Sequence, residues 1–117
     1  MGRASRQKGK VGEREWAAFL RERGIPARRG VQFHGGADAP DVVAEIEGMH
    51  AEVKRVEALR IWPALEQAQA DAAAARLMPY VAHRPNRRPW VVVMAAEDWL
   101  RLVIEAGRAQ AALPKVD

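Results

Sequence analysis

Two carboxylates and an amine lie close together in the sequence, at spacings that suit phosphodiester chemistry. Asp41 follows Pro40, and Glu52 and Lys54 flank Val53 on the next predicted strand. Carboxylate oxygens and a backbone carbonyl, here that of Val53, suit a magnesium ion, which can activate water for attack. The ammonium of Lys54 could position that water or stabilise charge on the phosphate. The alternative is that Lys54 only forms an ion pair on a solvated sheet face.

Alternation along the two predicted strands groups these side chains. Residues 41–46 and 49–54 have strand character and are separated by a Glu-Gly pair that is typical of a hairpin turn. A two-residue loop would place Asp41 opposite Lys54, with Glu52 on the same face of the sheet. The alternate positions of both strands are apolar and predict the core side.

Few other nucleophiles are available in this chain. It has no cysteine and no threonine, and Ser5 is its only serine. Serine recombinase, acyl-transfer and cysteine hydrolase mechanisms therefore lack an attacking group, and water remains. The three histidines, His34, His50 and His83, show no zinc-site spacing, which argues against a zinc site.

The predicted elements follow the order helix, three strands, helix, two strands, helix. Their expected ranges are 10–23, 25–29, 41–46, 49–54, 63–77, 80–83, 90–95 and 98–106. This order predicts an α/β fold, a single domain with a mixed central β-sheet flanked by helices. We expect a basic flexible N-terminal arm over 1–9, the folded domain over 10–112 and a C-terminal tail over 113–117.

The charge of the chain favours a polyanionic partner. Its net charge is +4 and its sequence pI is about 10.1. Clustered cations gain free energy by releasing counterions from a phosphate backbone. The alternative for each cluster is a solvated surface. The predicted DNA-binding cations from these clusters are Lys8, Lys10, Arg28, Arg29, Arg87 and Arg88.

Glu13 is a third candidate acid. A helical wheel places it within the apolar stripe of the first helix, between Leu20 and Ala17. A carboxylate on a core-facing stripe is costly unless it has a partner. The alternative is a first-turn glutamate that the helix dipole favours.

Several motifs in order resemble the archaeal-type Holliday junction resolvases, a branch of the PD-(D/E)xK nuclease superfamily. The resemblance extends from about Lys8 to Trp90. It is carried by Lys8-Gly9, Glu13-Arg14-Glu15, Arg29, Pro40-Asp41 and Glu52-Val53-Lys54.

The resemblance implies a restriction-endonuclease-like fold and a homodimeric, magnesium-dependent endonuclease, with manganese as a plausible substitute. Such an enzyme introduces paired nicks in four-way DNA junctions during recombination and repair. By this resemblance Glu13, Asp41 and Glu52 are the acidic metal-site residues and Lys54 is the catalytic lysine. The resemblance also implies that Arg14 and Arg29 contact phosphates. It further implies an accessory glutamine near the site, which is Gln67 or, alternatively, Gln69.

Two departures from the family pattern leave alternatives for the substrate. The loop before Asp41 lacks the serine that family members often carry, and the helix predicted over 98–106 follows the usual end of the domain. A nicking or repair nuclease acting on flaps or duplex DNA is therefore one alternative. A non-catalytic nucleic-acid-binding module is the other.

No apolar run approaches the about 20 residues of a membrane span, and we expect a cytoplasmic protein.

Overall fold

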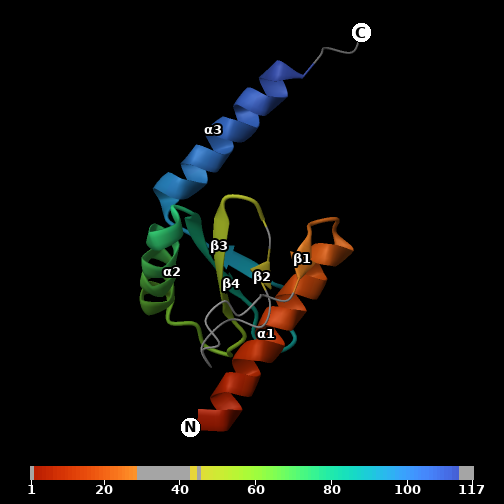
Figure 1. Cartoon of the computed structure of the whole chain (residues 1–117), viewed down its shortest axis with the longest axis vertical. Helices are drawn as coiled ribbons and strands as arrows, with labels where there is room; N and C mark the ends of the chain where they lie inside the picture. Colours follow the sequence, from red (N-terminus) through yellow and green to blue (C-terminus); the bar gives the residue numbers. More distant parts are fainter. Residues whose placement is uncertain (1, 29–42, 45, 114–117) are drawn as a thin grey trace.

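The computed structural model describes residues 2–28, 43–44 and 46–113, with side chains for 9–26 and 46–113. Within these described residues, three helices and five strands follow one another in the predicted order (Figure 1). Their bounds are α1 (Gly2–Glu22), β1 (Ala27–Arg28), β2 (Val43–Ala44), β3 (Met49–Lys54), α2 (Ile61–Ala75), β4 (Met78–His83), β5 (Val91–Val93) and α3 (Ala96–Ala112). The α/β architecture with a mixed sheet is confirmed.

Helix α1 begins earlier than the sequence predicted. It starts at Gly2, so residues 2–9 have helical backbone where we expected a basic flexible arm. Arg, Gln, Lys and Ala, which dominate this stretch, have high helix propensity, and one internal glycine costs only about 1 kcal/mol. Helix α3 is also longer than predicted at both ends. The division into domain and tail stays a prediction.

The strands form two described sheets. In the larger one β3 runs parallel to β4, from Met49 opposite Met78 to Lys54 opposite His83, and β5 runs antiparallel to β4. In the smaller one β2 pairs antiparallel with β1. The turn before β3 is confirmed, since the Met49 amide donates to the Ile46 carbonyl at 3.0 Å. The predicted pairing of Asp41 with Lys54 lies outside the described residues.

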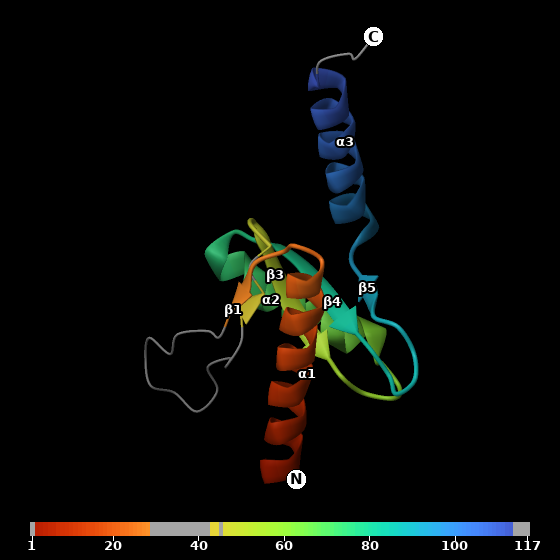
Figure 2. The same cartoon turned by 90° about the vertical axis from the view of Figure 1, so that its right-hand side faces the viewer.

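Strand β4 lies at the centre of the core, between two helices that cover opposite faces of the sheet (Figure 2). Tyr80 and Ala82 point towards α1, whereas Val81 points towards α2. All three are at most 2% exposed. On one side they meet Trp16, Ala17 and Leu20, and on the other Ala64, Leu65 and Ala68.

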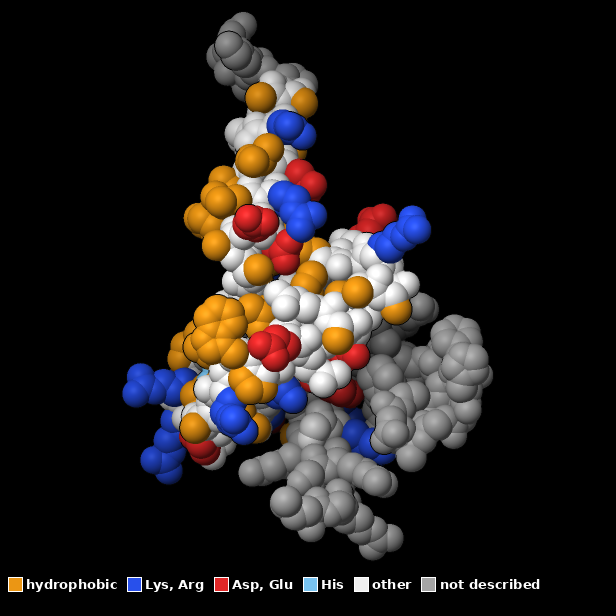
Figure 3. Space-filling view, turned by 90° about the vertical axis from the view of Figure 1, so that its left-hand side faces the viewer, with side chains coloured by type: hydrophobic (Ala, Val, Ile, Leu, Met, Phe, Trp, Pro, Cys, Tyr) orange, Lys and Arg blue, Asp and Glu red, His pale blue; other side chains and the backbone are white. Residues whose placement is uncertain are grey.

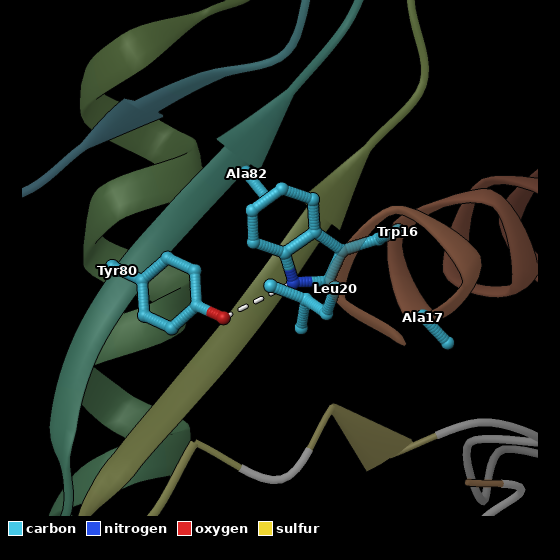
Figure 4. Packing of buried hydrophobic residues seen from close by; sticks show 5 residues of the cluster. All are labelled: Trp16, Ala17, Leu20, Tyr80 and Ala82. Atoms are coloured by element: carbon cyan, nitrogen blue, oxygen red, sulfur yellow. Dashed lines mark hydrogen bonds between the residues drawn. The ribbon is translucent and has the colours of Figure 1, made fainter. Parts of the chain in front are cut away.

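One buried hydrogen bond joins α1 to this strand. The indole Nε1 of Trp16 donates to the hydroxyl of Tyr80 at 3.1 Å (Figure 4). The Trp16 ring also packs against Phe19 and Trp90, with centroids 5.3 and 5.0 Å away. Burial raises the pKa of the Tyr80 hydroxyl above its ordinary 10.0, and the hydrogen bond from Trp16 opposes this effect. Tyr80 is therefore a neutral core residue.

Helix α3 leaves the body of the molecule and extends along its longest dimension (Figures 1 and 2). Its apolar side chains Trp99, Leu100, Val103 and Ile104 are 55%, 48%, 46% and 52% exposed. Figure 3 shows hydrophobic side chains along this projecting helix. Among the described residues, no helix has both the length and the apolar character that crossing a membrane requires.

The buried hydroxyl predicts how the protein responds to alkaline pH. Tyr80 is the only tyrosine, so the absorbance of tyrosinate reports this one group. We expect it to ionise above pH 10 in the folded protein and near pH 10 in urea. Its contribution to the free energy of unfolding should be complete below pH 10 and lost as pH rises through the folded pKa. Tyr80→Phe should lose less free energy of unfolding over this pH range. Titration of Tyr80 at the same pH in folded and unfolded protein would contradict the prediction.

Candidate active site

Strand β3 carries the predicted catalytic pair. Glu52 is opposite Val81 in the parallel ladder, so alternation places Glu52 and Lys54 on the face of the sheet that α2 covers. The intervening residues Ala51 and Val53 pack in the core with α1. The prediction that alternate positions of this strand would face the core is confirmed.

Glu52 and Lys54 are within ion-pair distance. The Nζ atom of Lys54 lies 3.5 Å from Oε1 of Glu52. The Lys54 side chain is 37% exposed and that of Glu52 is 20% exposed. Both groups can therefore be reached by a phosphate. In a high dielectric such a pair contributes little to the stability of the fold. A chemical role therefore accounts for the pair better than a structural one does.

Two groups that the sequence interpretation missed lie beside Glu52: His50 on β3 and Asp71 on α2. Nε2 of His50 lies 4.0 Å from Oε2 of Glu52 and 3.9 Å from Oδ2 of Asp71. The amide of Gln67, the predicted accessory residue, donates to both oxygens of Asp71 at 3.2 and 3.0 Å. Gln67 thus contacts the site through Asp71. A signal existed, because His50 shares a strand face with Glu52 and Asp71 follows Gln67 by one helical turn.

Arg55, which follows Lys54, connects three elements around the candidate site. Its Nε donates to Oε2 of Glu15 on α1 at 2.8 Å. Its terminal nitrogens donate to the Arg84 carbonyl at 3.1 Å and to Oδ1 of Asn86 at 2.9 Å. A Cβ added at Gly12 would lie only 2.7 Å from the Cβ of Arg55, so α1 approaches the strand end closely here. Sequence interpretation gave Arg55 no role.

The turn between β4 and β5 presents two predicted DNA-binding residues. Arg87 and Arg88 are exposed. The turn is held by Arg84, whose Nε donates to the Arg88 carbonyl at 2.9 Å, and by Asn86, whose backbone N–H donates to Oε1 of Glu57 at 3.0 Å. Arg87 has φ of 62°, a left-handed backbone conformation that usually favours glycine or asparagine.

The remaining predicted residues are placed to different degrees. Glu13 is half-buried on α1, and the exposed Lys10 and Arg14 lie on the same helix. Lys8 and Arg28 are described only as backbone, in α1 and β1. Asp41 and Arg29 lie outside the described residues. The roles of all seven stay predictions.

Comparisons with known proteins agree with this geometry. The family model described as archaeal Holliday junction resolvase matches residues 4–102. A solved structure of Hjc, a Holliday junction resolvase of the archaeal hyperthermophile Archaeoglobus fulgidus, is similar at 27% identity and a TM-score of 0.52. The similarity covers 74% of this chain and 72% of that chain. A search of curated proteins gave no match.

The match places the mixed sheet and its helices in the restriction-endonuclease-like fold. It also implies a divalent metal ion and branched DNA as the substrate. The family model covers most of this chain. The chain therefore belongs to the archaeal Holliday junction resolvases and is a junction-cleaving endonuclease.

Proposed function

We propose that this resolvase makes paired nicks in four-way junctions with a magnesium ion at Asp41, Glu52 and the Val53 carbonyl. Glu13 would complete the metal site from α1. The observation that carries the proposal is the 3.5 Å pair of Glu52 and Lys54 on one strand face, in a chain of this family. All four donors offer oxygen, which suits magnesium, and manganese would substitute for it.

Each residue then has a separate task. When bound, the ion supplies activated water and polarises the phosphate. Glu52 and Asp41 hold the ion, and the ammonium of Lys54 lies close enough to stabilise charge that develops on the phosphate. Gln67 acts indirectly, since its amide fixes the carboxylate of Asp71 beside His50 and Glu52.

Cleavage of a four-way junction tests this assignment. Glu52→Gln, Asp41→Asn and Lys54→Ala should each lower the cleavage rate in magnesium by about a hundredfold or more, with junction affinity nearly unchanged. The matched control is Glu47→Gln, which removes an exposed carboxylate in the turn before β3 and should cut normally. Rates are measured on a fixed junction and on linear duplex of the same sequence. Equal cutting of both substrates would contradict junction selectivity, and cutting by Glu52→Gln would contradict the metal site.

The β4–β5 turn is proposed to contact phosphates. A non-glycine residue in the left-handed region costs about 1 kcal/mol, and asparagine tolerates it better than arginine. Arg87→Asn should therefore leave stability unchanged or slightly raised, while junction affinity falls and the log-log salt slope decreases by roughly one unit. Arg76→Asn is the matched control, because Arg76 has φ of 56° at the end of α2 and loses the same charge. If both variants keep the salt slope of the parent, Arg87 is only a solvated surface residue.

We also propose that two copies associate through the apolar side of α3. Paired nicks require two centres, which a two-fold dimer supplies. The half-exposed residues Trp99, Val103 and Ile104 offer an uncovered apolar surface on a projecting helix. Antiparallel pairing of two such helices would bring Glu97 near the start of one helix close to Arg108 near the end of the other. Charge complementarity thus favours a second copy as the partner.

Sedimentation velocity tests the dimer. Val103→Glu places a charge on the apolar side and should convert the protein into a monomer at micromolar concentrations. Ala112→Glu adds the same group on the charged side of α3 and should leave the dimer intact. A monomeric parent protein, or a Val103→Glu variant that still dimerises, would contradict this interface.

A further inference from the structure

His50 has a ring nitrogen with an unusual environment. Within the described part of the chain, Nε2 is shielded from solvent and has no hydrogen-bond partner. Buried polar atoms normally have one, because leaving such an atom unpaired costs about 1 to 3 kcal/mol. This nitrogen points to a ligand that protein atoms do not supply.

The neighbours of this nitrogen are two carboxylates at nearly equal distances. Oε2 of Glu52 is 4.0 Å away and Oδ2 of Asp71 is 3.9 Å away. Both distances are too long for hydrogen bonds, and they exceed by about half an ångström the roughly 3.4 Å that separates neighbouring ligands of a tetrahedral zinc ion. The three ligand atoms lie within 4.8 Å of one another, so small side-chain movements would let one ion contact all of them.

The supporting structure fixes these ligands. Gln67 donates to both Asp71 oxygens, which is the kind of outer contact that orients a metal-binding carboxylate. Ala72, next to Asp71, is only 1% exposed, and Ala68 is fully buried against the sheet. The ligands thus come from a strand and a helix that pack together closely, and neither is on a loop.

The chemistry of the set distinguishes it from the proposed magnesium site. An imidazole with two carboxylates suits zinc and related transition metals, whereas magnesium prefers oxygen donors. We infer that His50, Glu52 and Asp71 form a second metal site, which binds a zinc-class ion and thereby withdraws Glu52 from magnesium-dependent cleavage. The inhibitory part rests on the proposed role of Glu52. The ligands come from two elements, which is why sequence spacing argued against zinc.

Binding is tested first, without DNA. Zinc is titrated into the full chain in competition with a chromophoric chelator, and cobalt is added separately because its visible absorption reports nitrogen and oxygen coordination. The parent should bind one ion per chain, and His50→Gln and Asp71→Asn should bind at least about tenfold more weakly. The matched control is His83→Gln, which changes a histidine on the adjacent strand whose Nε2 lies 2.8 Å from the Val56 carbonyl. It should bind as the parent does.

Inhibition is tested next, with junction DNA and magnesium. The zinc concentration that halves cleavage should be at least about tenfold higher for His50→Gln than for the parent. Equal zinc affinities of parent and His50→Gln would overturn the site. Equal inhibition of the two would overturn the link to Glu52. A parent that cuts no junction in zinc-free magnesium would contradict the proposed function alone, because the zinc titration contains no DNA.

Discussion

The burial of β4 on both faces is the constraint on which the rest of the structure depends. Val81 fills one side and Tyr80 and Ala82 fill the other, all almost without solvent exposure. Because β3 is hydrogen-bonded to this strand in parallel register, its own alternation is fixed too. A shift of β3 by one residue would turn Val53 away from the core and Glu52 into it. The apolar core therefore determines which side of the sheet carries Glu52 and Lys54.

The sequence predicted most of what depends on local periodicity. The apolar side of α1, the bounds of β3 and the faces of Glu52 and Lys54 follow from helical or strand spacing, and the structure agrees. The family came from the order of short motifs along the chain, which the match over residues 4–102 confirms. The early start of α1 was missed because Gly9 and the polar composition suggested an arm, while helix propensity alone was sufficient.

Contacts between distant segments could not be predicted in the same way. Asp71 is brought to His50 by the packing of α2 on the sheet, and no spacing within either segment shows this. The links from Arg55 to Glu15 and Asn86 likewise join residues 40 and 31 positions apart. The close approach at Gly12 also requires the positions of a helix and a strand end together. Such features belong to the assembled fold.

The extended α1 has a consequence for how the protein meets a polyanion. Its first turns, residues 2–9, already have helical backbone, and they continue into the segment where Gly12 allows α1 to approach Arg55 closely. A basic segment that is ordered in advance loses less conformational entropy on association than a flexible one does. For a phosphate backbone that meets this helix, α1 is a preorganised contact. Binding through this helix then requires fewer new contacts, because less conformational entropy is lost when the complex forms.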